Sequence, residues 1–400
     1  MRSRWLAGTA AIVLAIPVVS ACDKSDAPAH NASPPVTVSL PDKPMSAEAA
    51  AAVEKTVSAL QAANATEAPA VLVGVWDPAK GFYTGVFGKS EAASAADTVR
   101  IGSITKTFVA TLVLQLVAEG RLTLDGTVGQ YVPELATRYP EVGSRTVEQL
   151  LSMRSGLPDY AAAVTGRIAS EPALTSKAWT ADELIKDALA DGPVGPAGAT
   201  PASYSNTNYI VLGEILEKVT GMSLPDLVSA RLLKPLALNR TAYPPAGDTR
   251  LAAPASHGYV MAGGVGELTV AGGTFRAGTD VSDWTASWGG AAGIMSSTVG
   301  DLARWAATGF GSATLPESLR TARAKSVRLE HLGEYGLGLQ KLGAWSGHMG
   351  GVPGWSTVAL RNTTSGAIVV VAVDACCGDT SSVLPLRVVD ALYPGTLSLT

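Results

Sequence analysis

The segment from Thr105 to Glu119 is almost wholly apolar and is followed by Gly120, a residue type that commonly ends helices. A helix with no polar face has to be buried on all sides, because any exposed face would place apolar side chains in water. We therefore expect this helix to run through the middle of the protein. With 400 residues, of which 47% are hydrophobic, the chain can supply the large core that such a helix requires.

Strand-like runs lie toward both ends of the folded region. The runs APAVLVGVWDP and GFYTGVFGK flank the turn residues Asp77 to Lys80 and predict a hairpin, and a second pair of runs flanks Asn362 to Gly366. From about residue 122 to 245 the pattern is mainly helical, with Gly and Pro at the breaks. The sequence therefore predicts an α+β fold, in which a central antiparallel sheet built from both termini is flanked by helices and carries an inserted helical subdomain.

A glycine-rich run extends from Gly263 to Gly290. It lacks the strand, helix and phosphate-loop context of a nucleotide site. We interpret it as a flexible surface loop.

The N-terminus has the features of a bacterial secretion signal. Arg2 and Arg4 precede an apolar run that ends in Val19-Ser20-Ala21-Cys22, and this ending resembles the lipobox, in which the cysteine becomes lipidated. We expect residues 1–21 to be a lipoprotein signal peptide and Cys22 to anchor the mature chain to the bacterial membrane, outside the cytoplasm. A short membrane anchor followed by an incidental cysteine is the alternative.

Composition then separates a tether from a folded domain. Residues 22–45 are rich in Ala, Pro, Ser and Asp and predict a flexible tether. Residues 46–395 predict one folded domain, which begins with a helix capped by Ser46. No segment of that domain is apolar over the roughly 18 residues that span a membrane. The net charge of -4 argues against a nucleic-acid partner, and we expect a monomer.

Ser103 and Lys106 stand one turn apart where the apolar helix begins. A serine hydroxyl needs a neighbouring base to become a nucleophile, and residues at i and i+3 share one face of a helix. Burial lowers the pKa of a lysine, which makes a neutral, proton-accepting amine available. The free N–H groups of the helix start can stabilise an oxyanion. A serine that only caps the helix is the alternative interpretation.

Two further segments carry candidate site residues. Tyr204 and Asn206 lie in a loop ahead of a helix, where the tyrosine could relay a proton and the asparagine could bind a substrate amide. A packed tyrosine beside a capping asparagine is the alternative. His348 precedes Gly350 and Gly351 on a strand-like run, where glycines permit close approach and a strand edge offers N–H groups to a peptide-like substrate. Alone, His348 could equally be structural.

In this order the three elements resemble the penicillin-recognising serine hydrolases, which comprise class C beta-lactamases, actinomycete D-alanyl-D-alanine carboxypeptidases and related serine esterases. The resemblance covers nearly the whole chain after the tether, and the actinomycete carboxypeptidases look closest. It is carried by IGSITKTFVATLVLQLVAEGRLTLD, LLSMRSGLP, YSNTNYIVLGEILEKVTG, AAGIMSSTVGDLARW, YGLGL and GHMGGVPGW.

The resemblance implies a role for each candidate residue. Ser103 would be acylated, and Lys106 and Tyr204 would transfer protons. Asn206 would bind substrate, and His348 would complete the hydrogen-bonded network on the edge strand. The oxyanion hole would consist of the N–H groups of the nucleophile and of Gly351.

Two departures from the carboxypeptidase pattern bear on the substrate. Met349 and Gly351 stand where those enzymes tend to carry hydroxyl residues, and Gln340 stands where the similar ones have an arginine that pairs with the substrate carboxylate. Such charge-assisted bonds contribute about 1.5 to 3 kcal/mol each. We therefore expect a substrate site, with Gln340, Gly350 and Gly351, that lacks the usual carboxylate clamp.

The main interpretation is a lipid-anchored serine hydrolase for small-molecule or peptidoglycan-peptide substrates with an ester or amide bond, carboxypeptidase-like or esterase-like. One alternative is a non-catalytic or single-turnover lipoprotein that binds penicillin or the cell wall. Another is a Ser-His-Asp hydrolase with His348 as base, although no G-x-S-x-G motif is present. The scattered histidines predict no metal site, and no cofactor is implied. The adjacent Cys376 and Cys377 could be reduced or form a vicinal disulfide.

Overall fold

The computed structural model describes residues 39–88, 94–261, 267–270, 273–331, 333–376 and 379–398. The predicted signal peptide, Cys22, most of the predicted tether and Cys377 lie outside these ranges. Among the helices within them, none is both long enough and apolar enough to cross a membrane.

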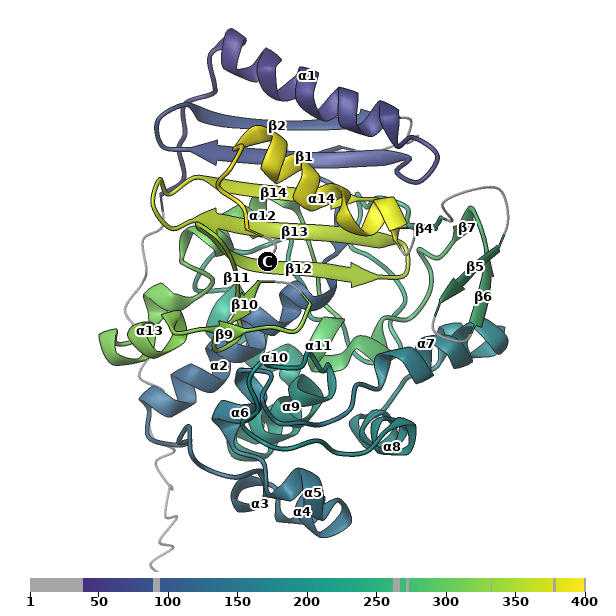
Figure 1. Cartoon of the computed structure of the whole chain (residues 1–400), viewed down its shortest axis with the longest axis vertical. Helices are drawn as coiled ribbons and strands as arrows, with labels where there is room; N and C mark the ends of the chain where they lie inside the picture. Colours follow the sequence, from purple (N-terminus) through teal and green to yellow (C-terminus); the bar gives the residue numbers. More distant parts are fainter. Residues whose placement is uncertain are drawn as a thin grey trace, which may run out of the picture. The chain divides into compact units, whose positions relative to one another are not determined.

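In the described part of the chain, eight antiparallel strands form the central sheet, in the order β2-β1-β14-β13-β12-β11-β10-β9 (Figure 1). The strands are β1 (Ala70–Asp77), β2 (Gly81–Gly88), β9 (Val327–Arg328), β10 (Glu334–Tyr335), β11 (Gln340–Leu342), β12 (Trp345–Val352), β13 (Trp355–Asn362) and β14 (Ile368–Val373). Strand β1 pairs with β14, with Val71 opposite Val373. The prediction of one antiparallel sheet built from both ends of the sequence is confirmed.

Both faces of this sheet are covered. Helices α1 (Ala47–Ala63) and α14 (Asp379–Leu392) lie over one face, and α12 (Val299–Ala307) and α2 (Thr105–Ala118) lie toward the other (Figure 1). Alternate side chains of β1 enter the two cores, with Val73 on the side of α1 and Leu72 on the other. Burial on both sides explains why β1 and β14 are continuous apolar runs in the sequence.

Helix α2 is the buried helix that the sequence predicts. Its residues from Thr105 to Leu116 are all buried. The Phe108 ring stacks on Trp305 of α12 with the ring centroids 4.1 Å apart, and the Trp305 indole donates a hydrogen bond to Thr107 Oγ1 at 2.7 Å. The prediction of a central helix is confirmed.

A helical region lies below the sheet in Figure 1. Its elements are α3 (Val128–Tyr131), α4 (Pro133–Arg138), α5 (Pro140–Gly143), α6 (Val147–Leu151), α7 (Ala161–Ser170), η2 (Pro172–Ser176), α8 (Ala181–Asp191), α9 (Thr207–Thr220), α10 (Leu224–Val228) and η3 (Ser229–Leu233). This region is the helical insertion of the predicted α+β fold, and the fold class is confirmed.

The remaining short elements connect these layers. They are β3 (Val99–Arg100), η1 (Gly102–Ile104), β4 (Tyr259–Val260), β5 (Glu267–Val270), β6 (Gly273–Arg276), β7 (Thr279–Asp280), η4 (Ser287–Gly289), α11 (Gly290–Gly293), β8 (Ser296–Ser297), η5 (Ser312–Thr314), α13 (Glu317–Ala324) and β15 (Ala375–Cys376).

The interpretation of the glycine-rich run as a flexible surface loop is wrong for its paired strands and for its buried end, while residues 263–266 and 271–272 lie outside the described ranges. Strands β5 and β6 pair with each other, and β7 pairs with β4. The residues from Thr285 to Gly289 are buried. Segment α11 contacts both α2 and α9, which is possible because its small side chains allow the three backbones to approach one another.

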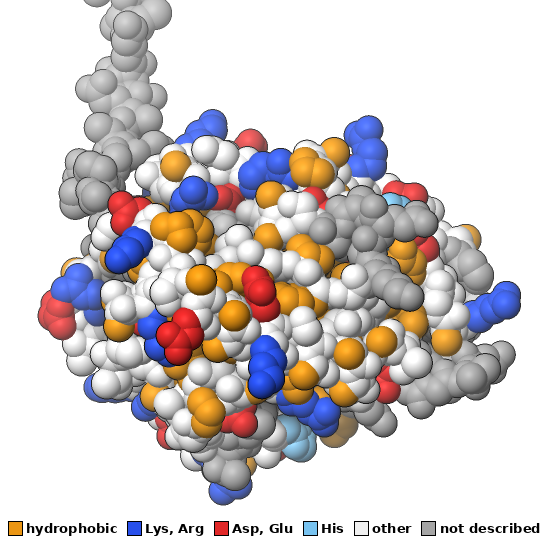
Figure 2. Space-filling model, turned by 90° about the horizontal axis from the view of Figure 1, so that it is seen from above, with side chains coloured by type: hydrophobic (Ala, Val, Ile, Leu, Met, Phe, Trp, Pro, Cys, Tyr) orange, Lys and Arg blue, Asp and Glu red, His pale blue; other side chains and the backbone are white. Residues whose placement is uncertain are grey.

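The chain is held against the sheet shortly before α1. The N–H of Met45 donates to Phe82 O at 2.9 Å, and the N–H of Phe82 donates to Lys43 O at 2.9 Å. These bonds lie just ahead of the boundary at residue 46 that the sequence predicts. On the face shown in Figure 2, cationic and anionic side chains are interspersed rather than gathered by sign.

Candidate active site

Ser103 lies where the start of the central helix meets strand β12. Gly102 has a φ of 49°, and a Cβ on it would be 2.8 Å from the N atom of Gly351. A Cβ on Gly350 would be only 2.0 Å from the carbonyl oxygen of Ile101. Glycine at both positions therefore lets the helix start lie directly against β12, an approach that side chains would prevent.

The amine of Lys106 is the centre of the site. Lys106 is completely buried, and its Nζ lies 2.9 Å from Ser103 Oγ, 2.7 Å from Asn206 Oδ1 and 2.8 Å from the carbonyl oxygen of Ala292. Burial lowers the pKa of Lys106 to about 7, and the carboxylate of Asp159 partly opposes this shift. A substantial fraction of the amine is therefore neutral near pH 7.

The three partners of Lys106 fix the direction of its lone pair. A neutral amine has two hydrogens and one lone pair, whereas the carbonyl oxygens of Asn206 and Ala292 can only accept hydrogen bonds. The two hydrogens therefore point to these oxygens, and the lone pair is left for the hydroxyl hydrogen of Ser103. This is the arrangement that a general base needs.

Asp159 holds Asn206 in the required orientation. The Asn206 Nδ2 donates to both oxygens of Asp159, at 3.1 and 2.9 Å, so Oδ1 of the same amide faces Lys106. Burial raises the pKa of Asp159, while its hydrogen bonds and the nearby Lys106 oppose the shift. The N–H of Ala161, at the start of α7, also donates to Asp159 Oδ1, at 3.1 Å.

Tyr204 also reaches the serine. Its side chain hydrogen-bonds to Ser103, and Lys106 Nζ lies 5.0 Å from the centre of its ring. Burial raises the pKa of Tyr204 far above its ordinary value of 10. Tyr204 is therefore a neutral phenol that can pass a proton, whereas Lys106 is the stronger candidate for the base.

His348 is buried with both ring nitrogens engaged away from the serine. Its Nδ1 lies 2.5 Å from the carbonyl oxygen of Met349, and its Nε2 lies 2.9 Å from the hydroxyl of Tyr335. The carbonyl can only accept, so Nδ1 carries the proton and Nε2 accepts from Tyr335. Burial and the nearby Lys106 lower the pKa of His348 to about 3. Neither nitrogen is left to deprotonate Ser103, which disfavours the Ser-His-Asp alternative.

The buried histidine predicts a loss of stability in acid. Its pKa of about 3 in the folded protein lies below its ordinary value of 6.5, so the unfolded chain binds more protons between these two pH values. The free energy of unfolding should therefore fall as the pH drops from 6.5 towards 3, by up to about 1.4 kcal/mol per pH unit from this residue. Urea unfolding of the parent protein and of His348→Gln, each at pH 6.5 and pH 5, measures this change in the free energy of unfolding.

The matched control for this experiment is His331→Gln, because His331 is exposed. The control should keep the pH dependence of the parent, and His348→Gln should reduce it. An identical pH dependence in the parent and His348→Gln would show that His348 is not neutral in the folded state.

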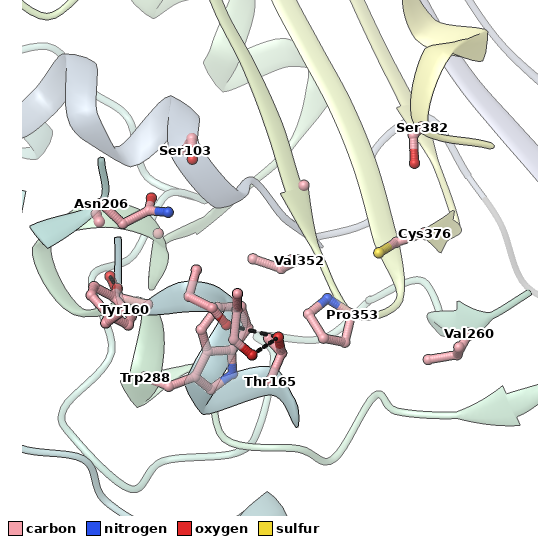
Figure 3. Close-up of a pocket in the computed structure, with 16 residues that line it drawn as sticks. Ser103, Tyr160, Thr165, Asn206, Val260, Trp288, Val352, Pro353, Cys376 and Ser382 are labelled. Carbon is pink, nitrogen blue, oxygen red and sulfur yellow. Dashed lines mark hydrogen bonds between the residues drawn. The ribbon is translucent and has the colours of Figure 1, made fainter. Parts of the chain in front are cut away.

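A cavity of about 470 Å³ opens beside Ser103 and Asn206 (Figure 3). Tyr160 and Trp288 lie on one side, and Pro353 lies farther from the serine. None of the described residues that line this cavity is Asp, Glu, Lys, Arg or His. The cavity is therefore a mainly apolar space without charged side chains, lined by a few polar ones, as is usual for small-molecule sites.

The structure separates the four predicted substrate-binding residues into two groups. Asn206 and Gly351 line the cavity, whereas Gly350 and Gln340 do not. Gly350 faces Ile101 beneath the strand. Gln340 is buried, and its Oε1 accepts the N–H of Met349 at 2.8 Å. Gln340 therefore satisfies an edge-strand donor that an extended peptide could otherwise use.

Comparison with known proteins identifies the family. Residues 53–375 match the family model described as Beta-lactamase. The chain belongs to the beta-lactamase family. This family lies within the serine hydrolase superfamily that includes penicillin-binding proteins, so the family resemblance seen in the sequence is confirmed.

Several relatives of this beta-lactamase family member have known sequences or structures. Penicillin-binding protein 4 from Amycolatopsis lactamdurans is 30% identical over 246 residues, which cover 60% of this chain and 58% of that protein. The chain thus spans less than two thirds of that relative. The solved structure of a D-stereospecific amidohydrolase from Streptomyces sp. is 30% identical, with a TM-score of 0.72, and the match covers 87% of this chain and 99% of that one.

A second solved structure supports the fold alone. The D-amino acid amidase from Ochrobactrum anthropi SV3, complexed with L-phenylalanine amide, is 24% identical with a TM-score of 0.71, and the match covers 86% of this chain and 97% of that one. Both structural neighbours agree with the α+β architecture described above.

Sequence reasoning missed Asp159 and Ala292 in this beta-lactamase family site. Asp159 directly follows the LLSMRSGLP motif, and an acidic residue there was the available signal. Ala292 acts through its backbone oxygen, for which no side-chain pattern exists. At the far side of the cavity, Cys376 is disulfide-bonded, so the reduced alternative does not hold for this residue. In the described ranges, no group of three or more His, Cys, Asp or Glu side chains could hold a metal ion.

Proposed function

We propose that this chain is an extracytoplasmic, lipid-anchored serine hydrolase that forms an acyl-enzyme on Ser103 with amide or ester substrates. The observation that carries the proposal is the contact set of Lys106. Two oxygens that can only accept hold the hydrogens of the neutral amine, and the lone pair is directed at Ser103 Oγ, 2.9 Å away. A structural lysine or a simple helix-capping serine has no need of this arrangement.

Acylation begins when Ser103 Oγ transfers its proton to Lys106 Nζ and bonds to the substrate carbonyl carbon. The carbonyl oxygen then carries the negative charge, and the N–H groups of Ser103 and Gly351 stabilise it. When the carbon–nitrogen or carbon–oxygen bond breaks, the leaving group takes the proton from Lys106 through the hydroxyl of Tyr204. The leaving amine or alcohol departs, and the acyl group stays on Ser103.

Deacylation uses the same groups in the reverse direction. A water molecule gives a proton to the Lys106 and Tyr204 pair and attacks the ester carbon. The bond between that carbon and Ser103 Oγ breaks, Ser103 regains a proton, and the acid product leaves. Asn206 keeps the amine oriented throughout, because Asp159 holds its amide.

The cavity favours substrates that carry no carboxylate near the bond to be cleaved. No cationic side chain lines it, so a free carboxylate would lose hydration without gaining a partner. The structural neighbour that is 30% identical is named as a D-stereospecific amidohydrolase. We therefore propose amides or esters of D-amino acids with apolar side chains as the preferred class, ahead of peptides that end in D-alanine.

The substrate panel that tests this proposal compares D-phenylalanine amide, its L-enantiomer, a D-phenylalanine methyl ester and a D-alanyl-D-alanine peptide. With the full-length protein, kcat/KM should be at least about tenfold higher for the D-amide than for the carboxylate-bearing peptide, because one unpaired charge costs 1.4 kcal/mol or more. Intact-mass spectrometry should show an acyl adduct, and Ser103→Ala provides the background.

Two results would contradict the proposal. Turnover that persists in Ser103→Ala would exclude Ser103 as the nucleophile. A stable adduct without turnover would favour the alternative of a single-turnover lipoprotein that binds penicillin or the cell wall. The same assay on cell fractions tests the anchor: activity should sediment with membranes, and the Cys22→Ser variant should release it. Activity that stays in the membrane fraction of that variant would exclude anchoring through Cys22.

A further inference from the structure

A second cavity, of about 510 Å³, lies behind the wall of the catalytic cavity. The wall is the segment Ser287–Ile294, formed by η4 and α11. Trp288, Gly289, Ala292 and Gly293 line the catalytic cavity, and Ser287, Gly290, Ala291 and Ile294 line the second one. The same segment supplies Ala292 O, which accepts the hydrogen bond from Lys106. The two cavities are therefore neighbours that share one thin wall.

The second cavity has an open mouth and an apolar floor. Ser223 and Asp226 at its mouth are exposed, whereas Leu184, Ile210 and Ile294 are buried. Its volume falls in the range that holds ligands of amino-acid size and above. A small molecule with an apolar body can therefore enter it and bury that body.

The charged side chains that line the second cavity are all acidic. Glu214, Glu217 and Asp226 line it, and none of the described residues that line it is Lys, Arg or His. Glu217 accepts the N–H of Leu224 at 2.7 Å, and Asp226 accepts the hydroxyl of Ser223 at 2.6 Å. Glu214 has no hydrogen bond or ion pair with any described residue. One carboxylate in the cavity is thus free to bind a cation.

Burial makes Glu214 an unfavourable carboxylate in the empty cavity. Its pKa is raised, first by burial and then by the neighbouring carboxylates Glu217, Asp182 and Glu134, and the cation Arg138 opposes this shift in part. A bound cation would relieve both the lost hydration and the repulsion between like charges. Glu214 and Glu217 project from the same face of α9 as Ile210 and Gly213, which also line the cavity.

One further polar group that lines the second cavity lacks a partner. Trp179 is only 4% exposed, and its indole Nε1–H has no hydrogen-bond partner in the described residues. Buried polar groups normally have partners, so this N–H is available to a hydrogen-bond acceptor on the body of an occupant.

Arg138 is the cation that acts on Glu214, and it already pairs with Asp182. The other two cations nearby stand beside Trp179. Lys177 and Arg167 lie over the Trp179 ring, at 4.2 and 5.0 Å from its centre. Lys177 pairs with Glu183 and Arg167 pairs with Asp187, and neither cation lines the cavity.

We propose that the second cavity is a separate binding site for a small organic ammonium ion with an apolar or aromatic body, whose charge pairs with Glu214. The site is distinct from the proposed catalytic site, because the side chains of Glu214, Glu217 and Trp179 form no hydrogen bond with Ser103 or Lys106. An occupant of the second cavity would contact the segment Ser287–Ile294, which also carries the Ala292 carbonyl that orients Lys106.

Calorimetric titration of the full-length protein with 2-phenylethylammonium tests the site directly. This probe should bind, whereas 3-phenylpropionate, with a similar body and the opposite charge, should not. Glu214→Gln should weaken probe binding by about tenfold or more, because it removes a charge-assisted bond. Glu141→Gln is the matched control, since Glu141 is exposed on α5, and it should leave binding unchanged.

A second variant guards against an indirect effect of Glu214→Gln on folding. Ala246 is exposed and lines the cavity, so Ala246→Arg should fold normally and repel the probe. Neither variant should change hydrolysis measured without the probe. In the hydrolysis assay the probe should not compete with the substrate.

Three outcomes would overturn the proposal. Equal binding of the anionic and cationic probes would indicate a merely apolar cavity. Competitive inhibition that Glu214→Gln leaves intact would place the amine in the catalytic cavity. If 2-phenylethylammonium did not bind to the parent protein, the proposed site would not exist. Because calorimetry does not need turnover, these outcomes can be told apart from a failure of the proposed hydrolase activity.

Discussion

Replacing Lys106 with methionine is expected to lower kcat/KM by about 10³-fold or more, which is within the range for loss of a general base. Methionine matches much of the length and shape of lysine but has no lone pair to accept the Ser103 proton. In the parent protein, kcat/KM should rise with pH through about 7, because burial lowers the pKa of Lys106 to that value and the reaction needs the neutral amine. The measurement is kcat/KM against pH for both proteins.

The matched control is Lys218→Met. Lys218 lies at the exposed end of α9, where it pairs with Glu134, so its loss should leave kcat/KM within about twofold of the parent. Circular dichroism and thermal unfolding establish that both variants fold. A loss smaller than tenfold in Lys106→Met would mean that another group takes the proton from Ser103.

Replacing Gly102 with alanine is expected to lower kcat/KM by about 10²-fold. A Cβ on Gly102 would be 2.8 Å from Gly351 N, so the helix start and β12 would have to separate. The two N–H groups that the proposed oxyanion hole needs lie on these two elements. A displacement of this kind costs on the order of 10²-fold when reacting groups are misaligned. Steady-state kinetics with the amide substrate measures the effect.

The control variant Gly120→Ala distinguishes the effect of backbone strain from the effect of separating the helix start and β12. Gly102 and Gly120 both have a positive φ, of 49° and 70°, so alanine at either position should cost about 1 to 2 kcal/mol of stability. A Cβ on Gly120, however, would meet no atom within 4 Å. Gly120→Ala should therefore lose stability but keep its activity. If Gly102→Ala and Gly120→Ala had similar kcat/KM values, the close approach of the helix start to β12 would not be needed for activity.

The contact between the proposed nucleophile and its proposed base could be predicted because the two residues are close in sequence. Ser103 and Lys106 are three residues apart at a helix start, so helix geometry alone brings them together, and the observed distance of 2.9 Å agrees with that prediction. The buried environment of Lys106 was also predictable, because the helix that follows has no polar face.

Residues that act through distant partners could not be predicted in the same way. Asp159 holds Asn206, 47 positions later in the chain, and Ala292 O meets Lys106 across 186 positions. Nothing in the local sequence of either indicates the other. The role of His348 could not be predicted for a different reason. A histidine at this position of the sequence could be a general base, and only its contacts with Tyr335 and Met349 show that neither ring nitrogen is free to accept the Ser103 proton.

By itself the sequence determined the buried central helix, the hairpins at both ends and the pair of Ser103 and Lys106, because each depends on periodicity or spacing over a few residues. The tertiary structure decided the orientation of the Lys106 lone pair, the neutral state of His348 and the burial of the glycine-rich segment that forms the wall between two cavities. These depend on which distant atoms are neighbours and on how much water is excluded, and the folded arrangement alone fixes both.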